Sequence, residues 1–350
     1  MSVVDISCLC GKVKSRVRLA GHVPVESYLC HRSQCRYNLG SLCHAALLIG
    51  KRPNVLDLLK VYVINDNLSR YFCDTCGSHM VEKSEYWKVQ SGIIEGIHSE
   101  QVSYALEAIA GHQHVHEAVD GGLSLCLTDK IPGEGSMHEI ETKLHCAGEG
   151  INTPQSHSPL SIHGRDRLQA SCICGGVQFF ITRPNQQSGQ CSSPFPDLMV
   201  PYHAQSPENP RDEKWWIRDD HKWLAGTCTC RSCRLGLGSP IQAWAFVSRA
   251  NIFNPDESPL AYDCGMLQSF ASSTGVRREF CQRCGATIFW HSDERPGVVD
   301  VSVGVLRAPE GSLARTWLEW WTERVSFAEQ AFDKEMVRHL ELGLHRLKST

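Results

Sequence analysis

The chain has 350 residues, of which 42% are hydrophobic and 21% are charged. This length suits two domains of ordinary size or one large domain, and the apolar fraction can build a packed core, which excludes wholesale disorder. The charges nearly balance, with 35 Lys and Arg against 38 Asp and Glu. Without a basic excess, nucleic acid is not expected as a partner. No apolar run reaches about 18 residues, so no membrane association is expected either.

The 18 cysteines are interpreted through the compartment that the sequence predicts. The first residues, 1–6, do not pair a basic segment with an apolar one, so we predict no secretory signal. We therefore expect a cytoplasmic protein, or a nuclear one, that is not secreted. In a reducing compartment, clustered cysteines are more typical of metal binding or catalysis than of disulfides.

The predicted elements are mainly strands. Short β-branched or alternating runs predict strands at 43–49, 240–248, 266–270, 287–291 and 298–305. Strands and helices do not alternate, which argues against a doubly wound fold. The clearest helix is predicted at the C-terminus, from about 326 to 347, where apolar residues recur every four positions. These residues are Phe332, Met336, Leu340 and Leu344.

Three cysteine motifs occur twice in the same order. Each series begins with CxCG and ends with CxxCG, and the second motif follows a phenylalanine. In the first series these motifs hold Cys8, Cys10, Cys73 and Cys76, and in the second they hold Cys172, Cys174, Cys281 and Cys284. The middle cluster holds Cys30 and Cys35 in the first series, and Cys228, Cys230 and Cys233 in the second. Two homologous domains are the economical explanation.

Composition predicts where these domains begin and end. Residues 126–165 are rich in Gly, Pro, Ser, His and Thr, which indicates a linker. We therefore predict domains at 3–125 and 166–330, followed by a C-terminal helical segment at 331–350. A proline-rich stretch at 184–222 is predicted to be a surface insertion, with the tryptophans at its end packed onto the body.

The outer motifs have the composition of structural zinc sites. A structural Zn²⁺ takes four ligands in a tetrahedron, and two short cysteine pairs supply four thiolates. The glycine after each pair suits the bend of the backbone around the ion. The spacing therefore predicts one structural zinc in each half of the chain.

The middle cluster of the second half predicts an open zinc site. Cys228, Cys230 and Cys233 are three thiols within six residues, and three protein ligands leave one position for water or a substrate. An electron-rich thiolate set suits the capture of a substrate thiolate better than hydrolysis. The alternative is a closed site completed by a distant residue. The candidates for that fourth ligand are Cys264, His203 and His221.

The middle cluster of the first half departs from this pattern. Arg32 occupies the central position, and a guanidinium does not bind a metal. Cys30 and Cys35 remain as metal-ligand positions of a degenerate cluster. A full set would require Cys43, His44 or His31. A second hypothesis is that Arg32 binds an anion such as a carboxylate.

At these motifs the sequence resembles the family of glutathione-dependent formaldehyde-activating enzymes and centromere protein V, in a fungal tandem form. The family pattern is CxCG, then CxCSxCR, then FCxxCG, and the resemblance covers roughly 3–125 and 166–330. It implies a mainly β fold of two tandem Mss4-like (β-tent) zinc-binding domains with a C-terminal helix. It also implies structural zinc at the outer cysteines and catalytic zinc at Cys228, Cys230 and Cys233, two structural ions and one catalytic ion in all.

The resemblance implies a carbon–sulfur lyase that acts on a small thiol or thiol adduct, of the S-hydroxymethylglutathione type, with glutathione as co-substrate. Arg231 and Arg234 flank the open cluster and are candidates for binding the carboxylates of glutathione. Arg231 replaces the serine of the family pattern, so substrate preference is expected to differ. The alternative function is a non-catalytic, zinc-stabilised binding or scaffold module. A methionine sulfoxide reductase, another Mss4-like fold, is disfavoured by the CxCG motifs.

Overall fold

The computed structural model describes residues 1–98, 106–127, 166–204 and 207–348. The described part is mainly β, as the sequence predicted, and it contains the predicted C-terminal helix and two further short α-helices. We refer to residues 1–127 as the N-terminal half and to residues 166–348 as the C-terminal half. The predicted linker at 126–165 falls almost entirely outside the described residues. Among those residues, no helix combines the length and the apolarity needed to cross a membrane.

The described residues of the N-terminal half form ten strands and one short α-helix, with 3₁₀ turns between them. The strands are β1 Val3–Ser7, β2 Lys14–Arg18, β3 Val25–Cys30, β4 Ala46–Leu48, β5 Lys60–Asn65, β6 Leu68–Phe72, β7 His79–Lys83, β8 Trp87–Gln90, β9 Ile94–His98 and β10 Glu107–Gln113. Helix α1 spans Ser33–Leu39. The largest sheet has the order β4-β8-β7-β6-β5, and smaller sheets have the orders β2-β1-β9 and β10-β3.

The described residues of the C-terminal half form eleven strands and two α-helices, with 3₁₀ turns between them. The strands are β11 Arg167–Ser171, β12 Gln178–Thr182, β13 Ile217–Arg218, β14 Lys222–Cys228, β15 Gln242–Ser248, β16 Ile252–Phe253, β17 Leu267–Ser273, β18 Val276–Cys281, β19 Thr287–Ser292, β20 Val298–Ser302 and β21 Leu318–Trp320. The helices are α2 Arg231–Leu237 and α3 Lys334–Leu347. The main sheet has the order β13-β14-β15-β20-β19-β18-β17, with β21 beside β14.

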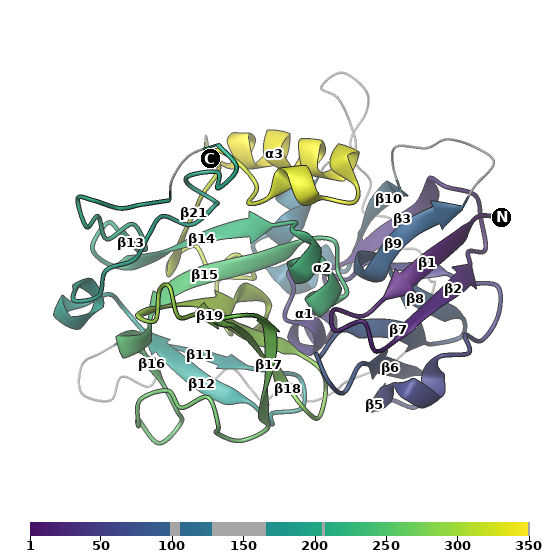
Figure 1. Cartoon of the computed structure of the whole chain (residues 1–350), viewed down its shortest axis with the longest axis horizontal. Coiled ribbons are helices and arrows are strands. Elements are labelled where there is room, and N and C mark those ends of the chain that lie inside the picture. The colour runs from purple at the N-terminus through teal and green to yellow at the C-terminus, as the bar shows by residue number, and fades with distance from the viewer. Residues whose placement is uncertain (99–105, 128–165, 205–206, 349–350) are drawn as a thin grey trace.

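The strand order of the two halves corresponds. The run β15-β20-β19-β18-β17 has the same connectivity as β4-β8-β7-β6-β5. The parallel pair β14·β21 likewise matches the parallel pair β3·β10. Helices α1 and α2 follow the corresponding strands β3 and β14, and both lie at the boundary between the halves (Figure 1). The halves therefore present equivalent elements to each other.

Helix α3 joins the two halves from one side of the molecule (Figure 1). It begins at Lys334, later than the sequence predicted, because Asp333 caps it by accepting a hydrogen bond from the Met336 N–H at 2.9 Å. The other oxygen of Asp333 accepts from the N–H of Leu106 in the N-terminal half. The apolar face of α3 is buried at Leu340, as its four-residue period predicted.

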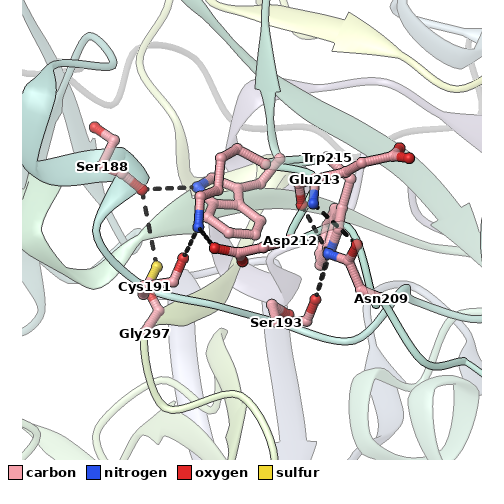
Figure 2. Close-up of polar contacts among 10 residues, drawn as sticks. Ser188, Cys191, Ser193, Asn209, Asp212, Glu213, Trp215 and Gly297 are labelled. Carbon is pink, nitrogen blue, oxygen red and sulfur yellow. Dashed lines mark hydrogen bonds and ion pairs between the residues drawn. The ribbon is translucent and has the colours of Figure 1, made fainter.

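The proline-rich insertion is anchored at its end, as predicted. Trp216 is fully buried, and its indole N–H donates to the carbonyl of Ser188 at 3.1 Å. Lys214 donates to the carbonyl of Cys191 at 2.8 Å and pairs with Asp212 (Figure 2). These contacts tie the described part of the insertion to itself. The ring of Trp215 packs against that of Phe246 in β15, and β13 pairs with β14, the strand that leads into the middle cysteine cluster.

Candidate metal centres and active site

Each half contains one cluster of four cysteines with the separations that zinc requires. The Sγ atoms of Cys8 and Cys10 are 3.5 Å apart, and those of Cys10 and Cys73 are 3.7 Å apart. In the C-terminal half, Cys174 lies 3.5 Å from both Cys172 and Cys281. Four sulfurs at about 2.3 Å from a central Zn²⁺ lie about 3.8 Å from one another. The sulfurs of each set, completed by Cys76 and Cys284, therefore fit a tetrahedral zinc site.

Backbone N–H groups donate hydrogen bonds to some of these sulfurs. The N–H of Val13 donates to the sulfur of Cys8 at 3.2 Å, and the N–H of Val177 donates to that of Cys172 at 3.3 Å. Such hydrogen bonds favour the thiolate form that a metal binds. Gly285, after the last cysteine, has a φ of +78°, a left-handed conformation that glycine adopts without strain.

Both four-cysteine clusters lie against the other half of the chain. A methyl group added to Gly285 would lie 2.7 Å from the ring of Phe72, and one added to Gly77 would lie 2.6 Å from that of Phe280. The side chain of Asn38, in α1, donates to the carbonyl of Cys284 at 3.0 Å. Metal sites and domain contact are thus parts of one interface.

The middle cluster of the C-terminal half is placed by the start of α2. Cys228, Cys230 and Cys233 have their sulfurs within 4.8 Å of one another, and all three are buried. Cys230 is the N-cap of α2, and its sulfur accepts from the N–H of Cys233 at 3.3 Å. Among the described residues, no fourth metal-binding side chain joins this group. Neither Cys264, His203 nor His221 lies in it, so the cluster is a three-sulfur set.

A buried arginine accompanies this three-sulfur set. Arg278 donates to the sulfur of Cys233 at 3.6 Å and to the hydroxyl of Ser232 at 3.0 Å. Burial alone would lower the pKa of Arg278, but the neighbouring cysteine sulfurs outweigh burial and raise it. A Zn²⁺ ion with three thiolates carries a net charge of −1, which a guanidinium beside it balances.

The middle cluster of the N-terminal half has only two sulfurs. Cys30 and Cys35 lie 3.7 Å apart. No third metal-binding side chain among the described residues completes a set with them. Arg32 has the N-cap position of α1, as Cys230 has in α2, and its guanidinium lies 3.4 Å from Glu117. The carboxylate beside Arg32 therefore belongs to the chain itself.

Comparison with protein families gives a match over two segments of the chain. Residues 3–110 and 218–324 match the family model described as glutathione-dependent formaldehyde-activating enzyme. The chain belongs to this family. A search of curated proteins gave no significant match.

The structure adds to the family match at one point. Cys172 and Cys174 precede the second matched segment, 218–324, from which the proline-rich insertion separates them. Folding nevertheless places their sulfurs with those of Cys281 and Cys284. This glutathione-dependent formaldehyde-activating family member therefore has a complete four-cysteine cluster in each half.

Arg231 and Arg234 both contact a residue of the N-terminal half. Arg231 binds Glu95 through its Nε at 2.8 Å, and Arg234 binds the other oxygen of Glu95. Arg234 also donates to the carbonyls of Gly92 at 2.8 Å and Ile94 at 2.7 Å. The side chain of Arg234 is 6% exposed, whereas that of Arg231 is 57% exposed. Arg231 is thus the one with surface available to a ligand.

Sequence reasoning did not find Glu95 or the charges around the two-sulfur cluster. Arg70 is fully buried and donates to the sulfur of Cys35 at 3.1 Å and to Glu82 at 3.1 Å. The hydrogen bond from Cys30 and the charge of Arg70 lower the pKa of Cys35 to about 6 against the effect of burial. Arg70 and Arg278 both lie two residues before a phenylalanine–cysteine pair, so the repeat in the sequence marks the two arginines but not their contacts with the cysteine sulfurs.

Among its described residues, this family member has two other groups of potential metal ligands. One comprises Asp197, His203 and Glu329. The buried Asp197 already accepts from the N–H groups of Tyr202 at 3.0 Å and Phe327 at 2.7 Å, so it serves as a structural acceptor. The other comprises His114, His116 and Glu117. Arg32 binds both His114 and Glu117, and its positive charge opposes a cation there.

Proposed function

We propose that this protein is a zinc-dependent carbon–sulfur lyase that acts on an adduct of glutathione or of a related thiol, with chemistry of the S-hydroxymethylglutathione type. The observation that carries the proposal is the contrast between the clusters. Two sets have four sulfurs, whereas Cys228, Cys230 and Cys233 form a set of three. A four-sulfur site is saturated, and a three-sulfur site leaves a coordination position for the sulfur of a substrate.

The roles of the protein groups follow from their contacts. A bound Zn²⁺ would supply Lewis acidity and hold the substrate sulfur as a thiolate. Arg278 orients Cys233 and balances the charge of the cluster. Arg231, which is half-exposed beside Glu95, is the group we assign to a substrate carboxylate. Arg234 fixes α2 against the N-terminal half through its bonds to Gly92, Ile94 and Glu95.

The proposed reaction is a reversible addition of a thiol to a carbonyl carbon. In the lyase direction the carbon–sulfur bond of the adduct breaks, and its electron pair stays on sulfur. The hydroxyl group on the same carbon loses its proton as the carbonyl double bond forms. No electron acceptor is needed, because the reaction involves no net oxidation.

The test compares two cysteine variants in an assay of S-hydroxymethylglutathione breakdown and formation. Cys230→Ser removes a ligand of the open set, whereas Cys264→Ser changes a thiol that donates to Asn254 at 3.2 Å and belongs to none of the cysteine clusters of the described residues. We expect Cys230→Ser to reduce activity to background and Cys264→Ser to retain it. Full activity and full zinc content in Cys230→Ser would contradict the proposal. A zinc-loaded wild type without carbon–sulfur chemistry would favour the non-catalytic binding module.

A further inference from the structure

The correspondence of the two halves fails at one pair of charged residues. After β8 the chain runs Ser91-Gly92-Ile93-Ile94-Glu95, and after β20 it runs Val303-Gly304-Val305-Leu306-Arg307. Both segments begin with a 3₁₀ turn, Ser91–Ile93 or Val303–Val305. Gly92 packs against Gly238, at the end of α2, and Gly304 packs against Gly40, at the end of α1. Arg307 therefore occupies the position that corresponds to Glu95.

The arginine that faces this position also has a counterpart. Arg234 follows the last cysteine of its middle cluster, and Arg36 follows the last cysteine of the other. Arg234 is satisfied by two carbonyls and by Glu95. Arg36 faces a second arginine instead, because the carboxylate of this pattern is replaced by Arg307.

Arg36 is buried without adequate partners. Arg36 is only 4% exposed, and its Nε and Nη1 atoms have no hydrogen-bond acceptor among the described residues. Its Nη2 donates to the hydroxyls of Ser33 and Tyr37, each at a distance of 3.5 Å. A buried guanidinium that lacks acceptors is costly, since neither water nor protein replaces its lost hydration.

Arg307 lies against the same tyrosine, Tyr37, as Arg36 does. Its guanidinium carbon lies 3.2 Å from the ring centre of Tyr37, and that of Arg36 lies 5.0 Å from it. Its Nη2 donates to the hydroxyl of Ser171 at 2.9 Å and to the carbonyls of Ser171 at 3.0 Å and Cys172 at 3.4 Å, while its buried Nε has no acceptor among the described residues. Among the described residues, no carboxylate lies within 4.0 Å of either arginine. Burial would raise the pKa of Tyr37, yet the two arginines lower it.

We propose that Arg36, Arg307 and Tyr37 form a binding site for the oxyanion group of a small molecule, a phosphate or a carboxylate. Two guanidinium forks present several N–H donors toward one locus, a geometry that suits the oxygens of such anions. The hydroxyls of Ser33 and Ser171 accept hydrogen bonds from these two guanidinium groups, and both serines are partly exposed. The site is separate from the open zinc cluster and does not depend on the proposed lyase activity.

The experiment measures binding to the full-length zinc-loaded protein by calorimetry and by thermal unfolding. Inorganic phosphate and glutathione are the two probes, each compared with sodium chloride at equal ionic strength. Arg307→Glu restores the charge pattern of the Glu95–Arg234 pair and supplies Arg36 with a carboxylate. Arg52→Glu is the matched control, because it makes the same change of charge at an exposed position.

We expect the wild type and Arg52→Glu to be stabilised by at least one probe beyond the effect of chloride. Arg307→Glu should lose this stabilisation, and without a probe it should melt no lower than the wild type. A response to phosphate assigns the site to a phosphorylated ligand, and a response to glutathione that Arg307→Glu abolishes assigns it to a carboxylate.

The proposal is overturned if neither probe stabilises the wild type, or if Arg307→Glu responds as the wild type does. Should Arg307→Glu fail to fold, Arg307→Gln carries the test, because it removes the charge and keeps a polar side chain of similar length. It should weaken binding by about tenfold or more. Unchanged affinity in that variant would likewise overturn the proposal.

Discussion

A single substitution at Glu95 removes two ion pairs that link the two halves of the chain. Its two oxygens bind Arg231 and Arg234, which belong to the helix that carries the open cysteine cluster. Glu95→Ala removes both ion pairs and leaves the backbone contacts of the interface in place. We expect this variant to fold less stably and to position α2 less accurately.

The expected loss in the free energy of unfolding follows from the unequal burial of the two arginines. The Arg234 side chain is 6% exposed, and breaking a buried ion pair costs about 3–5 kcal/mol because one charge remains unpaired. Arg234 keeps its bonds to Gly92 and Ile94, so we expect a lower value, about 2–3 kcal/mol. Arg231 is 57% exposed, and its pair with Glu95 should contribute under about 1 kcal/mol.

A double-mutant cycle separates these two contributions. Urea unfolding at constant zinc would be measured for Glu95→Ala, Arg234→Met and Arg231→Met, singly and combined. The coupling free energy between Glu95 and Arg234 should exceed that between Glu95 and Arg231 by about 1 kcal/mol or more. A loss under about 0.5 kcal/mol in Glu95→Ala, or a reversed order of the two couplings, would refute the reasoning.

Three further predictions concern backbone, acid stability and metal content. Gly285→Ala should cost more than about 3 kcal/mol in urea unfolding, since its methyl group would meet the ring of Phe72 at a positive φ. At Gly175, where φ is also positive, the methyl group would lie 3.4 Å from the flexible end of the Gln178 side chain, so Gly175→Ala should cost only about 1 kcal/mol. Similar costs for the two variants would count against the packed interface. Burial lowers the pKa of three histidines to about 3: His31, His44 and His79. Just below pH 6.5 these histidines bind protons only in the unfolded chain. The free energy of unfolding should therefore fall by up to about 4 kcal/mol per pH unit below that pH. A urea midpoint that stays constant between pH 6.5 and 5.5 would contradict this prediction. Arg32→Cys should bind one additional zinc, because Arg32 has the backbone position of Cys230; unchanged elemental zinc would show that Cys30 and Cys35 cannot complete a site.

Sequence reasoning predicted those features that depend on short spacing. The strands expected at 240–248, 287–291 and 298–305 correspond to β15, β19 and β20. The two four-cysteine sets and the three-cysteine set assemble as their motifs indicated, although more than 100 residues separate Cys174 from Cys281. A cysteine pair that supplies two of the four ligands of a zinc ion requires a second pair. The motifs therefore predicted that two pairs far apart in the sequence would meet in the folded chain.

The sequence could not predict how the two halves meet. Helices α1 and α2 have seven residues each, too short for a periodic apolar pattern. Glu95 and Arg307 are unremarkable charged residues until the interface places them beside Arg234 and Arg36. The predicted start of α3 was too early because a period of four residues does not reveal that Phe332 precedes the cap. Contacts between distant segments, rather than local pattern, decide all of these features.

Zinc content per chain tests the central claim most directly, namely that one of three metal sites is open. It would be measured by elemental analysis of the wild type and of Cys230→Ser, each purified without added chelator. The account predicts three zinc ions per chain in the wild type and two in Cys230→Ser, with the two four-cysteine sites retained. Two zinc ions in both proteins would show that Cys228, Cys230 and Cys233 hold no metal, and would contradict the proposed mechanism.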